Sequence, residues 1–258
     1  MSSEIDWSRT YAAIWRSNKR YLRPVKEIDS ISLDRLVGID EQKCRVIENT
    51  ERFLSGKPAN NVLLWGSRGS GKSSLIRALL NEYRDRGLRV IQVERDDLIL
   101  LPEIVDDIRD LDYRFIIFCD DISFEASEGN YKALKSALDG SIEQPPVNVL
   151  VYATSNRRHL LPEYMKDNLD SKLIDKEIHH SDAVEEKISL SERFGLWIGF
   201  YQIDMDTYLQ IVDRYFSGYT GDRNQLRDTA REFALLRGSH NGRTAWQFYR
   251  SHADADTD

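Results

Sequence analysis

Short apolar runs alternate with helical patterns through most of the chain. Five runs predict strands, over about residues 61–65, 88–93, 114–119, 147–153 and 196–201. Apolar residues that recur at i, i+3, i+4 and i+7 predict helices over about 72–84 and 97–111. Strands that alternate with helices predict a parallel α/β sheet, and the continuous apolar run at 114–119 is typical of a sheet covered on both faces.

The pattern changes after residue 202. Three helical stretches follow without an intervening strand, over about 206–216, 222–236 and 242–252. They predict a small all-helical part that ends in a frayed acidic tail. We therefore expect three parts: an N-terminal extension over 1–31, an α/β core over 32–202 and a helical lid over 203–258.

The N-terminal extension carries apolar residues at helical spacing, which predict a short amphipathic helix through Trp7, Tyr11, Ile14 and Trp15. Basic residues lie among and after them. The favoured interpretation is an extension that packs on the core. The alternative is an arm that binds a partner or nucleic acid, because aromatic rings between basic residues can stack on bases.

Composition narrows the class of protein. The 258 residues are 41% hydrophobic and 31% charged, as in an ordinary globular protein. This length suits one large domain, or one core domain with a small appendage. The net charge of −7 disfavours nucleic acid as a partner, although it leaves room for a local basic patch. The first residues lack the apolar core of a signal peptide, and no apolar run approaches membrane-spanning length. We expect a cytoplasmic protein with no membrane partner.

The two cysteines, Cys44 and Cys119, lack the spacing of metal ligands. Both fall in patterns that predict burial, Cys44 on a helix whose inner face would include Ile47 and Leu54. Two isolated thiols suit a reducing compartment.

Residues 61–74 read NVLLWGSRGSGKSS, an apolar run followed by a glycine-rich loop. The spacing from Gly66 to Ser73 fits G-x-x-x-x-G-K-[ST], the phosphate-binding P-loop. Its glycines let successive N–H groups curl around an anion, and the next helix points its positive end at the same place. Lys72 adds a charge near the β- and γ-phosphates, and Ser73 is a Mg²⁺ ligand. We expect a nucleoside triphosphate to be held by Gly66, Ser67, Arg68, Gly69, Ser70, Gly71, Lys72, Ser73 and Ser74.

The strand at 114–119 ends in two carboxylates, Asp120 and Asp121. A P-loop ATPase needs an acid at the end of a neighbouring strand to help hold Mg²⁺, and Asp120 occupies that position. The following residue commonly polarises the attacking water, which assigns this role to Asp121. Glu125 is a less favoured base, and a solvent-facing turn is the alternative for the acid pair.

The strand at 147–153 runs into Asn156, which can place an amide near the γ-phosphate and the attacking water. The alternative is an asparagine that caps the next helix. For Arg157 and Arg158, which follow, the alternatives are a phosphate, a neighbouring subunit or solvent, and solvent is the default for single arginines in loops.

With these motifs in this order, the chain resembles an AAA+ ATPase. It resembles more closely an uncharacterised bacterial family of AAA+ ATP-binding proteins, a domain-of-unknown-function family, over about residues 32–250. The resemblance rests on the runs LVGIDEQKCRVIENTERFLSGKPANNVLLWGSRGSGKSSLI, FIIFCDDISFE, YKALKSALDGS, ATSNRRHLLPEYM and DAVEEKISLSERFGLWIGFY. It implies a parallel five-stranded P-loop NTPase sheet with a small C-terminal helical lid.

The resemblance also implies roles for single residues. Lys72 and Ser73 become the Walker A residues, Asp120 and Asp121 the Walker B pair, and Asn156 the sensor-1 residue. Residues 190–195 resemble the motif that carries the arginine finger, so Arg193 would reach the γ-phosphate of an adjacent subunit; the alternative is a charge that offsets a helix dipole.

Two lid and linker assignments complete the site. Arg243 resembles sensor 2, with Arg237 as the competing choice and a surface arginine as the alternative. Residues 36–39 resemble the segment that contacts adenine.

The expected function is a Mg²⁺-dependent ATPase that couples ATP binding and hydrolysis to remodelling or loading of an unidentified protein partner. Asp121 is one methylene shorter than the usual glutamate, which predicts slow hydrolysis. Because the resemblance implies that Arg193 acts on an adjacent subunit, a single chain should be a poor ATPase, and a nucleotide-dependent homo-oligomer should be the active form. The alternative is an ATP-gated switch with little turnover that contacts protein or nucleic acid through residues 1–31. A kinase using the same loop is a third option.

Overall fold

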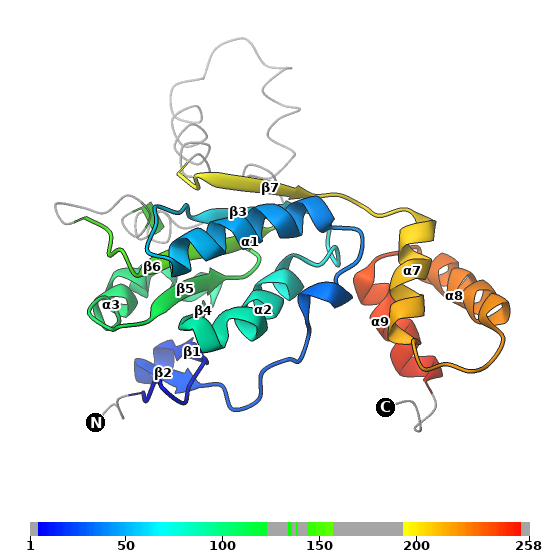
Figure 1. The fold of residues 1–258 in the computed structure, drawn as a ribbon, viewed down its shortest axis with the longest axis horizontal. Helices are drawn as coiled ribbons and strands as arrows, with labels where there is room; N and C mark the ends of the chain where they lie inside the picture. The colour runs from blue at the N-terminus through cyan, green and yellow to red at the C-terminus, as the bar shows by residue number, and fades with distance from the viewer. Residues whose placement is uncertain (1–4, 123–133, 136–137, 139–143, 157–192, 254–258) are drawn as a thin grey trace, which may run out of the picture.

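A seven-stranded sheet runs through the molecule, in the order β2-β1-β4-β5-β6-β3-β7. The computed structural model describes residues 5–122, 134–135, 138, 144–156 and 193–253. Its strands are β1 (Ala12–Arg16), β2 (Tyr21–Pro24), β3 (Val62–Gly66), β4 (Leu88–Val93), β5 (Arg114–Cys119), β6 (Val149–Ser155) and β7 (Leu196–Phe200). All neighbours pair in parallel except β2, which is antiparallel to β1 at one edge. Figure 1 shows this edge on the opposite side of the sheet from β7.

The predicted α/β class is confirmed, but the predicted count of five strands is wrong. The two additional strands come from the N-terminal segment, for which we expected an amphipathic helix. β1 pairs in parallel with β4, with Ala12 opposite Val90. Although the aromatic residues have helical spacing, the segment forms a strand, because the N–H and C=O groups at the edge of β4 would otherwise lack backbone partners.

The aromatic residues of the N-terminal segment anchor it to the core. Trp7 and Trp15 are buried in the cluster that contains Phe115, and the rings of Trp7 and Phe115 meet edge to face at 5.0 Å. The guanidinium of Arg89 lies over the Tyr11 ring, 5.0 Å from the centre of that ring. The two tryptophans are therefore buried and are not free to stack on bases.

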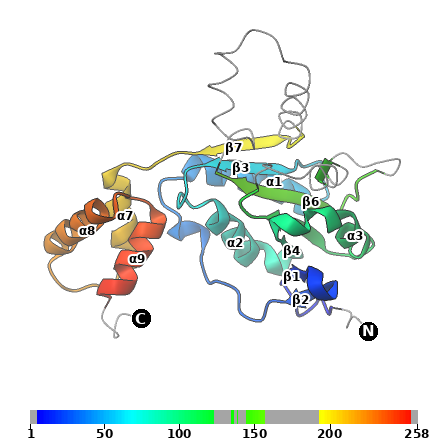
Figure 2. The same cartoon turned by 180° about the vertical axis from the view of Figure 1, so that it is seen from behind.

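Helices cover both faces of the sheet (Figures 1 and 2). α1 (Asp40–Leu54) and α2 (Lys72–Tyr83) pack on one face, and α3 (Leu101–Asp106) packs on the other. Residues of β5 alternate between the two cores, Ile116 and Phe118 facing α2 and Phe115 and Ile117 facing α3. In the part of the chain that the structure describes, four 3-10 turns connect the elements, at Ser17–Lys19, Leu33–Arg35, Arg84–Arg86 and Arg95–Leu100.

Two helix predictions need correction. The helix expected over 97–111 is confined to α3, because residues 95–100 form a 3-10 turn before it. On α1 the buried residues are Val46, Asn49, Thr50 and Phe53, so the inner face is rotated from the one expected. Cys44 is exposed, whereas Cys119 is buried as predicted.

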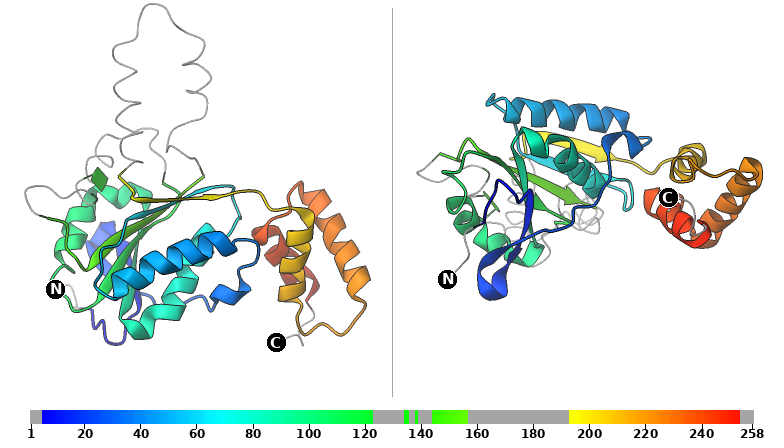
Figure 3. Two further views of the ribbon diagram at one scale, coloured as in Figure 1. Left: turned by 45° about the horizontal axis from the view of Figure 1, so that its top comes forward. Right: turned by 60° about the horizontal axis from the view of Figure 1, so that its bottom comes forward.

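Three helices follow β7 and form the lid: α7 (Met205–Tyr215), α8 (Arg223–Arg237) and α9 (Gly242–His252). Figure 3 shows them grouped to one side of the α/β part in both views. Side-chain caps begin all three, with Asp204, Asp222 and Asn241 each accepting a backbone N–H. Gly38 lets α7 approach the linker before α1, since a Cβ there would lie 2.4 Å from the side chain of Thr207.

Several predicted features lie outside the described residues, namely Glu125, Arg157 and Arg158, and the segment before Arg193. Among the helices that the structure describes, none has both the length and the apolarity needed to cross a membrane.

Candidate nucleotide-binding site

The P-loop follows β3 and is shaped by close backbone contacts. Ser67 N donates to Phe200 O at 2.8 Å, which joins the loop to the end of β7. A Cβ on Gly66 would lie 2.0 Å from the same oxygen, so only glycine fits there. Gly71 adopts a φ of 97° in the left-handed region, and α2 begins at the next residue. The loop therefore ends at a helix N-terminus, where anions are favoured.

Lys72 is folded over this loop. Its Nζ donates to Gly66 O at 2.8 Å and to Ser67 O at 2.7 Å, and only 7% of the residue is exposed. Burial lowers the pKa of Lys72 from 10.5 to about 8, against the opposing effect of Asp121 and Asp120. An anion above the loop would replace these carbonyl partners with full charges, which stabilises the ammonium form.

The lowered pKa of Lys72 predicts pH-dependent binding. Above pH about 8, Lys72 is mostly deprotonated in the empty site. A triphosphate favours the charged form of Lys72, so its binding at higher pH requires the uptake of a proton. We expect the affinity for ATP to fall as pH rises from 8 to 10, by up to about tenfold per unit. The free energy of unfolding of the empty chain should rise over the same pH range. In the unfolded chain the pKa of Lys72 is 10.5, so between pH 8 and 10 the unfolded chain binds this proton and the folded chain does not.

Calorimetric titration with ATP at a series of pH values measures this dependence. Lys72→Arg is the matched control, because arginine stays charged across the range and should give a flat profile. Parallel profiles for the two proteins would contradict the prediction.

The two acids at the end of β5 hold different places. Asp120 Oδ1 accepts from Ser73 Oγ at 2.7 Å and from Thr154 Oγ1 at 2.6 Å. A hydroxyl and a carboxylate oxygen thus lie side by side at the start of α2. Mg²⁺ prefers such oxygens and takes its remaining ligands from phosphates and water, so Ser73 and Asp120 fit a magnesium site.

Asp121 is exposed and has a φ of 51°, unusual for a residue other than glycine. Its carboxylate Oδ1 accepts from Asn156 Nδ2 at 2.5 Å, and its backbone N donates to Thr154 Oγ1 at 2.8 Å. Asn156 Oδ1 in turn accepts from Lys72 Nζ at 3.4 Å. The predicted acid, amide and lysine are therefore linked in one chain of contacts.

Thr154 was not assigned a role from sequence, although its hydroxyl contacts both acids. It lies near the end of β6, only 2% exposed, and pairs in register with Leu64 of β3. The sheet order places β6 between β3 and β5, so the end of β6 must lie between the P-loop and the acid pair. A threonine at the end of an otherwise apolar run was the available signal.

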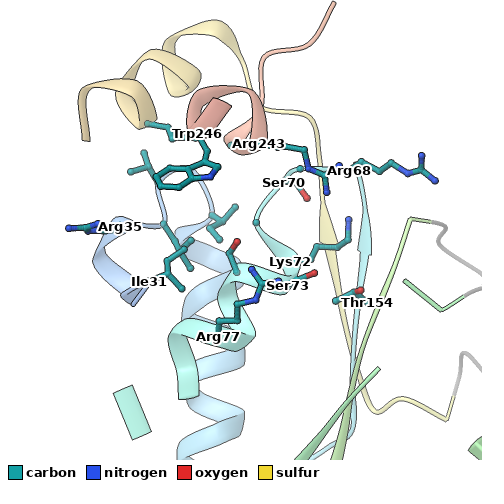
Figure 4. Close-up of a pocket in the computed structure, with 18 of the residues that line it drawn as sticks. Ile31, Arg35, Arg68, Ser70, Lys72, Ser73, Arg77, Thr154, Arg243 and Trp246 are labelled. Atoms are coloured by element: carbon teal, nitrogen blue, oxygen red, sulfur yellow. The ribbon is translucent and has the colours of Figure 1, made fainter. Parts of the chain in front are cut away.

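These groups lie at one end of a cavity of about 740 Å³ between the α/β part and the lid. Figure 4 shows Lys72, Ser73 and Thr154 at this phosphate-facing end, with Ile31 and Trp246 at the other. The apolar residues that line the cavity are Ile31, Leu36, Val37, Ile39, Ile203, Ile211, Tyr215 and Trp246. Charged residues line it as well, namely Asp29, Arg35 and Arg77, and Arg35 lies on the same side as Ile31 in Figure 4. The segment expected to contact adenine therefore lines the cavity.

The structure distributes the predicted P-loop residues in two groups. Those that line the cavity are Arg68, Gly69, Ser70, Gly71, Lys72, Ser73 and Ser74. Gly66 and Ser67 contribute the carbonyl groups that Lys72 contacts. The side chain of Arg68 points away from the phosphate-facing end in Figure 4.

The N-terminus of α9 touches the P-loop directly. Gly242 N donates to Gly69 O at 3.1 Å, and Asn241 Nδ2 donates to Arg68 O at 3.4 Å. Arg243 follows and lines the cavity, with its side chain directed toward Ser70 in Figure 4. Arg237 instead ends α8, and its guanidinium lies over Phe233 at 5.1 Å. Of the two arginines considered for the lid, only Arg243 is at the cavity.

Arg193 does not line the cavity of its own chain. It lies three residues before β7, whereas the P-loop meets the opposite end of that strand through Phe200. The structure therefore does not place Arg193 at the P-loop end of its own cavity.

The P-loop after β3, the acid pair after β5, the polar end of β6 between them and the helical lid define an AAA+ protein of the P-loop nucleotide-binding class. The chain belongs to the family described as "Protein of unknown function (DUF815)", which matches residues 8–255.

Short segments resemble two replication proteins. The Replication factor C large subunit of Staphylothermus marinus is 38% identical over 63 residues, 24% of this chain and 14% of that protein. The ORC1-type DNA replication protein 14 of Haloarcula marismortui is 35% identical over 68 residues, 26% of this chain and 15% of that protein. The chain thus matches only a small part of either relative.

Among solved structures, the Thermotoga maritima RuvB Holliday junction branch migration motor matches 85% of this chain and 71% of that chain, at 16% identity and a TM-score of 0.49.

Proposed function

We propose that this protein binds ATP with Mg²⁺ in the cavity between core and lid and hydrolyses it to ADP and phosphate. The observation that carries the proposal is the contact chain from Lys72 through Asn156 to Asp121, beside the Ser73–Asp120 pair, at one end of a cavity whose other end holds Ile31 and the Trp246 indole. This arrangement suits a ligand with a charged and an apolar end.

Each residue has a definable role in such a reaction. Lys72 exchanges its carbonyl partners for phosphate oxygens, and Arg243 adds a second charge from the lid. Ser73 and Asp120 would hold Mg²⁺, which neutralises phosphate charge when bound. Asp121 orients the attacking water and takes up its proton, with Asn156 positioning the carboxylate. Charge that develops on the departing phosphate is thereby met by fixed donors.

The lid is the element through which the cycle would act on a partner. It touches the P-loop at Gly69, and it contacts the linker at Gly38 through Thr207. A shift of the P-loop on phosphate binding would therefore act directly on α9, through the hydrogen bond from Gly242 N to Gly69 O. We propose that this movement remodels or loads a protein partner, with a nucleotide-dependent homo-oligomer as the active form and nucleic acid disfavoured by the net charge of −7.

One observation favours an ATP-gated switch as the second candidate. Asp121 is already held by Asn156 and has a left-handed backbone, so reorienting it toward water has a cost. Slow turnover would leave ATP bound long enough to gate a partner.

Replacing Asp121 with asparagine tests the assignment of the base. We expect Asp121→Asn to lower steady-state phosphate release about 100-fold, because general-base catalysis is lost. ATP affinity should be unchanged, since Lys72 and the P-loop remain. Equal turnover in the variant and the original chain would contradict a basic role for Asp121, and bound ATP without measurable release in the original chain would favour the switch.

A further inference from the structure

The geometry points to Trp246 as a nucleobase-stacking residue that the lid contributes to the site. The inference rests on the proposed function, since it assigns the end of the cavity at Ile31 and Trp246 to the base of the bound nucleotide. It adds a side chain on α9 that sequence reasoning left without a role.

Trp246 combines exposure with a fixed position. It lines the cavity, yet 44% of the residue is exposed, one of the few large hydrophobic residues so open among those described. In Figure 4 its indole lies opposite Ile31, at the end away from Lys72 and Thr154. An indole face beside aliphatic side chains is a surface on which an aromatic base can stack.

Two tyrosines hold this indole in place. The Trp246 ring stacks on Tyr249 at 5.5 Å with 25° between planes, and it meets Tyr215 at 5.3 Å. Tyr215 and Tyr249 also stack on each other at 5.6 Å. A side chain braced in this way loses little conformational freedom when a ligand binds, which favours binding.

The same helix presents Trp246 and Arg243 to one ligand. They lie three residues apart on α9 and therefore share a face, and both line the cavity. The hydrogen bond from Gly242 N to Gly69 O sets this face over the P-loop. A nucleotide with its phosphates at Lys72 and Arg243 would thus have its base one helical turn along α9, at Trp246.

The test separates base from phosphate binding by titrating ATP and inorganic tripolyphosphate, which lacks a base, into the full chain. We expect Trp246→Ala to weaken ATP binding about 5- to 150-fold, the range for loss of one base–aromatic stack. Tripolyphosphate binding should be unchanged, which also shows that the lid remains folded and in place. Trp246→Phe keeps an aromatic face and should retain most of the ATP affinity.

Three results would overturn the inference. ATP affinity that is equal in Trp246→Ala and the original chain would show that the indole does not touch the base. Equal weakening of ATP and tripolyphosphate would show that Trp246 only supports the lid. An original chain that binds neither compound would overturn the proposed nucleotide binding itself, and the stacking role with it.

Discussion

Lys72→Ala is expected to abolish measurable binding of both ATP and tripolyphosphate and to lower ATP turnover about 1,000-fold, the upper range for removing one preorganised donor to developing charge. Lys72 is the buried cation at the phosphate-facing end, and its ammonium already lies over the P-loop at Gly66 and Ser67. Without it, only the backbone N–H groups and the proposed contact with Arg243 would remain for the phosphates, too few for measurable binding.

Thermal unfolding with and without nucleotide distinguishes this effect from damage to the fold. A ligand at about 100 times its Kd stabilises a protein by about 2.7 kcal/mol. This stabilisation should appear in the original chain and vanish in Lys72→Ala. The empty variant should be no less stable than the original chain, because burial of the Lys72 charge, which lowers its pKa to about 8, carries a cost.

Lys57→Ala is a suitable control, since Lys57 is exposed in the turn that follows α1 and does not line the cavity. It should behave as the original chain in both assays. Stabilisation by ATP that survives in Lys72→Ala would contradict the assignment of this cavity to phosphate binding.

Features with a local cause were predictable from sequence. The P-loop depends on glycines and a lysine within eight residues, and β5 depends on six consecutive residues that end beside Asp120. The lid helices carry their own caps, such as Asp204 and Asn241. In each case the residues that define the element are neighbours in the chain, so spacing alone indicates it.

Features that depend on distant residues were missed. β1 exists because β4 offers an open edge, and Thr154 contacts both acids only because β6 lies between β3 and β5. Trp246 reaches the cavity because α9 docks on Gly69, more than 170 residues away along the chain. Spacing within a segment carries no information about such pairings, which tertiary packing decides.

The second large effect concerns a residue that lies away from its own cavity. We expect Arg193→Ala to lower ATP turnover of the assembled protein about 1,000- to 100,000-fold, the range for an arginine supplied in trans. ATP affinity of the single chain should be unchanged, because Arg193 does not line its own site. Turnover per chain should rise with protein concentration in the original chain and stay flat in the variant. Arg250→Ala, on the exposed side of α9, is the matched control.

Mixing two inactive variants gives the sharpest measurement. Lys72→Ala lacks a working phosphate site but retains Arg193, whereas Arg193→Ala retains the site and lacks only the arginine. If the finger acts between chains, a mixture forms interfaces at which both groups are intact, and phosphate release should reappear at a level that depends on the mixing ratio. Each variant alone should stay inactive at every concentration.

A mixture as inactive as its components would show that Arg193 does not complete a neighbouring site, provided that size measurement in the presence of an ATP analogue and Mg²⁺ confirms assembly. Recovery would establish that the P-loop of one chain and Arg193 of the next belong to a single catalytic unit.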